Sequence, residues 1–155
     1  MQAILAVADN GEIGFKGGLP WGYNAKDLAH FKEKTLGKTL LCGKNTYNGL
    51  PAAVFKGRTV KMVSREDTVD GGLFEGDTSN SFIIGGTSLF TLENLERCDT
   101  IWLTYVNGTF EADTYLGLGL DLDDKVILFM NRENIRVYED EDIKIIKSLK
   151  RYGYE

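Results

Sequence analysis

The sequence contains few of the residues that build disulfide scaffolds and metal sites. Only two cysteines, Cys42 and Cys98, and one histidine, His30, occur among its 155 residues, and no CxxC motif or Cys/His cluster is present. Two thiols are too few for a disulfide framework, and a lone histidine within a predicted helix is more typical of a partly exposed surface residue than of a ligand. We therefore expect neither a disulfide scaffold nor a bound metal.

Long apolar runs and an excess of positive charge are also absent. No stretch reaches the roughly 20 apolar residues of a membrane-spanning helix. The opening MQAILAVADN lacks a basic leader, so it predicts a first strand and not a signal peptide. The net charge of −5 argues against a nucleic-acid partner, which needs a basic face. These absences favour a cytoplasmic protein that binds neither membranes nor nucleic acids.

The chain does contain short apolar segments that alternate with amphipathic ones. Its 155 residues, 43% of them hydrophobic and 26% charged, are enough for one domain (1–155) with a buried core. Candidate strands are 3–8, 39–42, 59–64, 81–84, 100–106, 126–130 and 143–149, and candidate helices are 25–36, 46–50 and 87–95. This alternation predicts an α/β fold with a central, mostly parallel sheet and flanking helices. The last strands have no helical pattern between them, which predicts an antiparallel edge at the carboxyl end.

The segment GGLPWGYNAKDLAHFKEKT combines a Pro-Trp pair with one carboxylate, Asp27. In the predicted helix Leu28, Phe31 and Thr35 form an apolar stripe, and Asp27 borders that stripe. A carboxylate at this position beside Trp21 could hydrogen-bond a flat polar ligand. The alternative is structural: Asn24 and Asp27 have the spacing of an N-cap and its N3 acidic partner.

Two junctions share the order of a buried strand, glycine and a helix start. One is Gly43-Lys44-Asn45-Thr46 and the other is Gly85-Gly86-Thr87-Ser88. Helix N-termini attract anions and glycine lets a ligand approach the backbone, so the pair favours a pyrophosphate ligand. The alternative is that the glycines only turn each strand into its helix. Neither junction matches the Walker A or GxGxxG spacing, which disfavours a P-loop ATPase and a Rossmann dehydrogenase.

Three further side chains are candidates on weaker grounds. Arg58, after the basic turn at Lys56, offers a bidentate fork to a carboxylate, and Arg65 follows Ser64 at the end of a predicted strand, where a cation suits a phosphate. Thr104, in an alternating strand, could hydrogen-bond a buried acid. Each of them also has an ordinary structural interpretation.

In their order along the chain these pieces resemble the dihydrofolate reductase family. The matching motifs are ILAVA, Ile13-Gly14, Leu19-Pro20-Trp21, Asp27-Leu28 with Phe31 and Thr35, GKNTY from Gly43, Gly57-Arg58, Ser64-Arg65, IIGG to Gly86, Leu103-Thr104 and EADTYL from Glu111. The resemblance covers residues 1 to about 116. It implies NADPH-dependent reduction of 7,8-dihydrofolate to 5,6,7,8-tetrahydrofolate by hydride transfer to pterin C6.

The resemblance also implies roles for individual residues. Asp27 would stabilise the protonated pterin, with Thr104 supporting it and Trp21 beside it in the catalytic centre. Substrate would contact Ile4, Leu28, Phe31, Leu50, Val54, Arg58 and Ile84. NADPH would contact Ala6, Ile13, Gly14, Gly18, Leu19, Lys44, Asn45, Thr46, Ser64, Arg65, Gly85, Gly86, Thr87, Ser88, Leu89 and Phe90. The loop 9–23 would be a mobile lid over the nicotinamide.

The chain departs from the family pattern at several places. Gly17 stands where asparagine is usual, Phe90 replaces a tyrosine, and the segment 66–81 is short and rich in glycine. The implied partners are dihydrofolate and antifolate-type small molecules, with no metal, and the protein is expected to be a monomer. Two alternatives stay open: a binding or structural protein of the same fold with weak turnover, and a related pterin or pyrimidine reductase that would not need Arg58.

Overall fold

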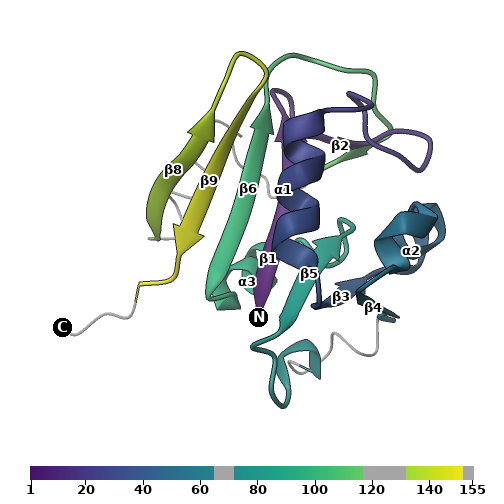
Figure 1. Cartoon of the computed structure of the whole chain (residues 1–155), viewed down its shortest axis with the longest axis vertical. Helices are drawn as coiled ribbons and strands as arrows, with labels where there is room; N and C mark the ends of the chain where they lie inside the picture. Colours follow the sequence, from purple (N-terminus) through teal and green to yellow (C-terminus); the bar gives the residue numbers. More distant parts are fainter. Residues whose placement is uncertain (65–71, 117–131, 152–155) are drawn as a thin grey trace.

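The computed structural model describes residues 1–64, 72–116 and 132–151, and its main feature is a seven-stranded sheet (Figure 1). The strand order is β4-β3-β5-β1-β6-β9-β8. The strands are β1 (Gln2–Ala8), β3 (Thr39–Cys42), β4 (Thr59–Met62), β5 (Ser81–Gly85), β6 (Thr100–Val106), β8 (Glu133–Glu139) and β9 (Ile143–Leu149). All pairs from β4 to β6 are parallel, and β9 pairs antiparallel with both β6 and β8. The predicted α/β class with an antiparallel edge is confirmed.

Both faces of this sheet are covered. Helix α1 (Ala25–Thr35) lies in front of the strands in Figure 1, and α3 (Leu92–Arg97) lies behind them. Phe31 of α1 packs on a cluster that contains Ile4 and Phe82, whereas Leu95 of α3 belongs to the larger cluster that contains Leu5 and Ile83. Side chains of β1 and β5 therefore alternate between two cores, as strand periodicity requires.

Smaller elements join the strands at one end of the sheet. They are α2 (Lys44–Gly49), the 3₁₀ helix η1 (Ala52–Phe55) and a two-stranded sheet made by β2 (Glu12–Gly14) and β7 (Thr114–Tyr115). None of the helices in the described ranges has the length and apolarity that a membrane crossing needs.

Some element boundaries differ from the predictions for physical reasons. The helix expected over 87–95 begins only at Leu92, because Leu89 and Phe90 close a turn on the carbonyl of Gly86 and the Thr91 side chain caps the helix by accepting from Asn94 N–H. The sequence gives no clear sign of β8. A bulge between Arg136 and Tyr138 interrupts its alternation. The strand predicted at 126–130 lies outside the described residues.

A buried arginine joins α3 to the antiparallel edge. Arg132 is 4% exposed and donates from Nε to Ser148 Oγ at 3.0 Å and from Nη2 to the carbonyl of Cys98 at 2.8 Å. Further contacts reach the carbonyls of Asp99 and Ser148. Because the last carbonyls of a helix have no partner within it, Arg132 satisfies groups that burial would otherwise leave unpaired.

We expect Arg132→Met to lower the free energy of unfolding by about 3 kcal/mol or more, because several buried acceptors lose a charged donor together. Urea denaturation of the purified variant measures this. The matched control is Arg136→Met, whose exposed pair with Glu139 is worth less than about 1 kcal/mol. Equal losses in the two variants would show that Arg132 does not stabilise this junction.

Candidate active site

The two central strands separate at the carboxyl edge of the sheet. β1 pairs with β6 over all seven of its residues, but with β5 only at Gln2–Phe82 and Ala3–Ile83. Ile84 is also skipped by a bulge on its other side, where Leu41 pairs with Ile83 and Cys42 pairs with Gly85. Ile4 of β1 and Ile84 of β5 are therefore the first residues beyond the point where the pairing of these two strands ends. Open α/β sheets bind ligands outside the carboxyl ends of their strands, at the point where the order of the strands along the chain reverses across the sheet.

Helix α1 places Asp27 at this edge. Asn24 caps the helix by accepting from Asp27 N–H at 2.9 Å, so half of the proposed capping box is present. The Asp27 carboxylate itself accepts a hydrogen bond from the Thr104 hydroxyl of β6, which is 1% exposed. Burial raises the pKa of Asp27 above its ordinary value, and the Thr104 hydrogen bond lowers it by less. The structural and the ligand-binding interpretations of Asp27 are therefore compatible. The backbone N–H of Asp27 donates to the Asn24 cap, whereas its carboxylate makes no bond within the helix cap.

The predicted substrate residues are largely gathered beside Asp27. Ile4, Phe31, Val54 and Ile84 share one apolar cluster. Leu28 is 37% exposed and Leu50 is half-buried, so both still offer apolar surface. This arrangement brings α1, η1 and the separating strands around one region.

Arg58 is fixed to the far end of α1. Its Nε donates to Thr35 Oγ1 at 2.8 Å, Nη2 to the Lys32 carbonyl at 2.9 Å and Nη1 to the Lys56 carbonyl at 2.8 Å. A guanidinium has five N–H donors, so one N–H on each terminal nitrogen stays available to a ligand carboxylate. These three hydrogen bonds hold the Arg58 side chain in one orientation, which is compatible with a structural role at α1 and with binding a carboxylate.

The two glycine junctions lie in contact with each other. Gly43 N–H donates to the Gly85 carbonyl at 3.0 Å. A Cβ at Gly86 would lie 3.0 Å from Thr46 Oγ1, and a Cβ at Gly43 would lie 3.5 Å from Ser88 Oγ. Glycine at Gly86 therefore lets Thr46 lie close to the backbone, and the two junctions lie side by side.

The remaining predicted cofactor residues differ in accessibility. Lys44, Asn45, Ser64, Thr87 and Ser88 are exposed. Leu89 and Phe90 have their side chains in the core, which leaves only their backbone for a ligand. Arg65 and residues 66–71 lie outside the described residues.

The loop that carries Ile13, Gly14, Gly18 and Leu19 reaches from the sheet to α2. A Cβ at Gly49 would lie only 2.6 Å from the Gly17 carbonyl, so the loop and the end of α2 are in contact. Leu19 is 49% exposed, and Ala6 at the start of this region is half-buried. The loop therefore bridges the separating strands and the helix that follows Gly43.

Two acidic residues that sequence reasoning gave no role hold this loop. Asp113 accepts from Lys16 N–H at 2.9 Å, and the buried Glu12 accepts from the backbone N–H groups of Asn10 and Phe110 at 2.6 and 2.7 Å. Asp113 stands within the EADTYL motif, which was the one available signal. The sequence gives no signal for Glu12, because a glutamate in a three-residue strand is normally expected at the surface, whereas this one is buried.

Trp21 lies at the base of the same loop. Its ring packs edge-on against Phe110 with centroids 6.1 Å apart. Its Nε1 is buried and has no hydrogen-bond partner in the part of the chain that the structure describes. A buried donor of this kind is suited to a ligand or an ordered water, which supports a place for Trp21 at the site.

Asp27 makes the fold less stable at neutral pH, because its pKa is higher in the folded than in the unfolded chain. Below the ordinary value of 3.8 both states are protonated and the effect vanishes. As the pH rises through 3.8 towards the folded pKa, the unfolded state ionises first and stability falls. We therefore expect Asp27→Asn to unfold at higher urea concentration than the parent protein at pH 7, with the difference disappearing towards pH 3.8. A stabilisation that does not change with pH would contradict this origin.

The comparisons with known proteins agree with this geometry. A family model described as dihydrofolate reductase matches residues 1–146. The chain is 30% identical to the type 8 dihydrofolate reductase of Escherichia coli, covering 89% of this chain and 92% of that one. It is also 30% identical to the dihydrofolate reductase of Mycoplasma genitalium, covering 76% and 83%. A solved dihydrofolate reductase of Enterococcus faecalis, complexed with NADP(H) and RAB-propyl, superimposes with a TM-score of 0.66 at 26% identity over 97% of this chain and 96% of that one.

Proposed function

The chain belongs to the dihydrofolate reductase family and reduces 7,8-dihydrofolate to 5,6,7,8-tetrahydrofolate with NADPH, and we propose that Asp27 is its central catalytic group. The observation that carries the assignment is a half-buried carboxylate at the point where β1 and β5 separate. Substrates of this family are small molecules, and antifolates share the same site. We further propose that the protein acts as a monomer in the cytoplasm, without nucleic-acid or membrane partners.

Asp27 acts on the pterin through charge and hydrogen bonding. Its carboxylate would accept from the N3–H and 2-amino groups of the ring and so stabilise the protonated pterin. Low polarity around Asp27 strengthens this interaction, and Thr104 holds the carboxylate in place. From such a position Asp27 does not reach N5, so a water would deliver the proton there. The unpartnered Trp21 Nε1 is a suitable donor for holding that water.

The residues around the glycine junctions fit NADPH. A pyrophosphate would lie against the backbone of these two junctions, where the glycines carry no side chain to cover the N–H groups. Lys44 and Arg65 would hold the 2′-phosphate, Ser64 would lie beside them, and Ala6, Ile13 and Gly14 would border the nicotinamide. When bound, NADPH supplies the hydride that reduces pterin C6. The loop from Gly14 to Leu19 would close over that end, with Asp113 holding Lys16.

The substrate tail is assigned to Arg58. Its two available N–H groups would bind the α-carboxylate of the glutamate, while Leu28, Phe31, Leu50 and Val54 would enclose the aminobenzoyl ring. Ile4 and Ile84 would offer backbone carbonyls to the pterin.

The test of the catalytic assignment is Asp27→Asn. We expect hydride transfer to slow by a factor of about 10² or more at pH 7, the scale of a positioned acid–base group. The deficit should shrink at low pH, because solvent then protonates the substrate. Single-turnover loss of NADPH absorbance with dihydrofolate, from pH 5 to 8, measures both effects. Unchanged activity of the variant at pH 7 would restrict Asp27 to its role at the helix start.

The test of the tail assignment is Arg58→Leu. Dihydrofolate binding should weaken by roughly 1.5–3 kcal/mol, the range of charge-assisted hydrogen bonds, while a pterin without the glutamate tail should bind almost as before. Lys56→Leu, which removes a neighbouring exposed cation, is the matched control and should change neither ligand. An equal loss for both ligands in Arg58→Leu would mean that the arginine only supports α1, and would favour a pterin or pyrimidine reductase.

A further inference from the structure

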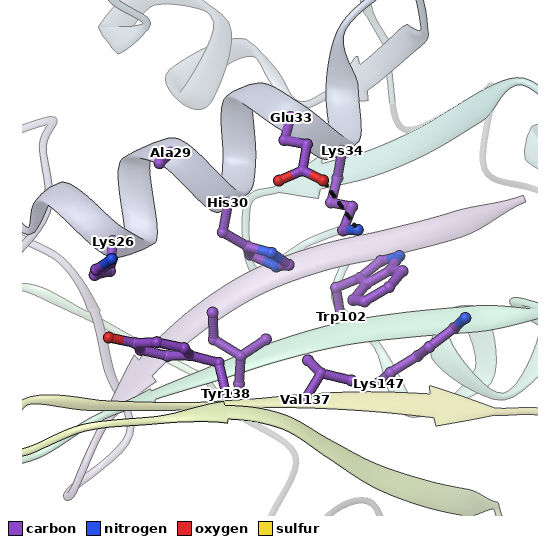
Figure 2. A pocket seen from close by; sticks show the side chains of 10 residues that line it. Lys26, Ala29, His30, Glu33, Lys34, Trp102, Val137, Tyr138 and Lys147 are labelled. Carbon is purple, nitrogen blue, oxygen red and sulfur yellow. Dashed lines mark ion pairs between the residues drawn. The ribbon is translucent and has the colours of Figure 1, made fainter.

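A second groove lies on a different face of α1, between that helix and the strands of the antiparallel edge (Figure 2). Its volume is about 440 Å³, which is within the range of small-molecule sites. The lining residues are Lys26, Ala29, His30, Glu33, Lys34, Trp102, Val137, Tyr138, Ile145 and Lys147. None of them has a role in the site proposed for folate and NADPH.

The floor of this groove is apolar and aromatic. Trp102 is 8% exposed, and its Nε1–H already donates to Gln2 Oε1 at 2.8 Å, so the ring needs no further partner. Val137 is 47% exposed although it is a large apolar residue. Together with Ile145 and Tyr138 it forms a surface suited to a flat apolar body.

Cations gather at the Trp102 end of the groove. Lys34 Nζ lies 4.5 Å and Lys147 Nζ 5.1 Å from the centroid of the Trp102 ring. Two ammonium groups over one ring repel each other. The lining carboxylate, Glu33, pairs with Lys34 at 3.7 Å but is 76% exposed, so it offsets little of this charge. At the opposite end Lys26 lies over Tyr138, whose hydroxyl donates to Asp140 at 2.6 Å.

His30 lies between the two ends and points from α1 towards the strands (Figure 2). Its ring packs edge-on against Trp102 with centroids 5.5 Å apart. The Nε2 atom is buried and has no hydrogen-bond partner among the described residues. Burial, and then the charge of Lys34, lower the pKa of His30. The groove thus holds an unused polar atom beside an excess of positive charge.

We propose that this groove binds a small monoanion with a flat apolar body, of the aryl carboxylate class. The body lies against Val137, Tyr138 and Ile145. The acid group lies beside the His30 ring and is balanced by Lys34 and Lys147. A neutral compound of the same shape lacks the negative charge that balances the two lysines.

The single histidine makes the test direct, because its imidazole C–H resonances report on this groove alone. Naphthalene-2-carboxylate is titrated into the protein while saturating folate and NADP⁺ occupy the substrate site, and 2-naphthamide serves as the neutral control. We expect saturable shifts of the His30 resonances with the acid and none with the amide. The pKa of His30 should rise in the saturated complex, because the bound anion offsets Lys34 and Lys147.

Two lysines of β9 supply matched variants. Lys147→Gln should weaken binding of the acid about tenfold, the effect of one charge-assisted contact of about 1.4 kcal/mol. Lys144→Gln should leave it unchanged, because Lys144 lies over Tyr105, on the other face of the sheet. Lys34→Gln provides a second loss of charge from α1. Equal binding of acid and amide, or equal affinities of Lys147→Gln and Lys144→Gln, would overturn the proposal.

Discussion

The parallel strands β1 and β5 stay neighbours for only two residue pairs, and the whole site depends on where they separate. On its other side β1 pairs with β6 along its whole length, whereas β5 pairs with β3, with a bulge at Ile84. Backbone groups of Ile4 and Ile84 therefore leave the sheet within the interior of the protein, where unpaired polar groups are costly. A ligand that pairs with them would remove that cost, which makes this position suited to a binding site.

Much of the fold could be predicted because its central strands are mostly apolar. Segments 39–42, 100–106 and 143–149 were expected with the bounds that the structure shows. The first two have little polar interruption, as is typical of strands covered on both faces, and the third has its lysines at half-buried positions between buried residues. Strand β8 was not predicted, because it is an edge strand whose apolar residues Ile135 and Val137 are exposed. Helix α3 was placed too early, because Leu89 and Phe90 close a separate turn on the carbonyl of Gly86 before Thr91 caps the helix, and helix propensity does not indicate that interruption.

The site could be predicted only in part. Residue types identified Asp27, Arg58 and the two glycine junctions as candidates, but each also had a structural interpretation. Spatial proximity adds information that residue types lack: Thr104 meets Asp27 from a distant strand, and Gly85 accepts from Gly43 across the sheet. Contacts between residues this far apart in the chain leave no periodic pattern in a single sequence. The order of motifs along the chain, which resembled one family, compensated for that missing information.

Helix α1 connects the two ends of the proposed substrate site. Asp27 stands in its first turn, and Thr35, which orients Arg58, stands at its last residue. Eight residues at 1.5 Å each place these two points on the order of 12 Å apart along a rigid axis. The acid and the guanidinium are thus kept at a fixed separation before any ligand binds, and three of the five N–H groups of Arg58 are already bonded to protein oxygens. Such preorganisation lowers the entropy lost on binding. On the assignment proposed for Asp27 and Arg58, the length of α1 therefore selects a substrate with a polar ring at one end and a carboxylate at the other.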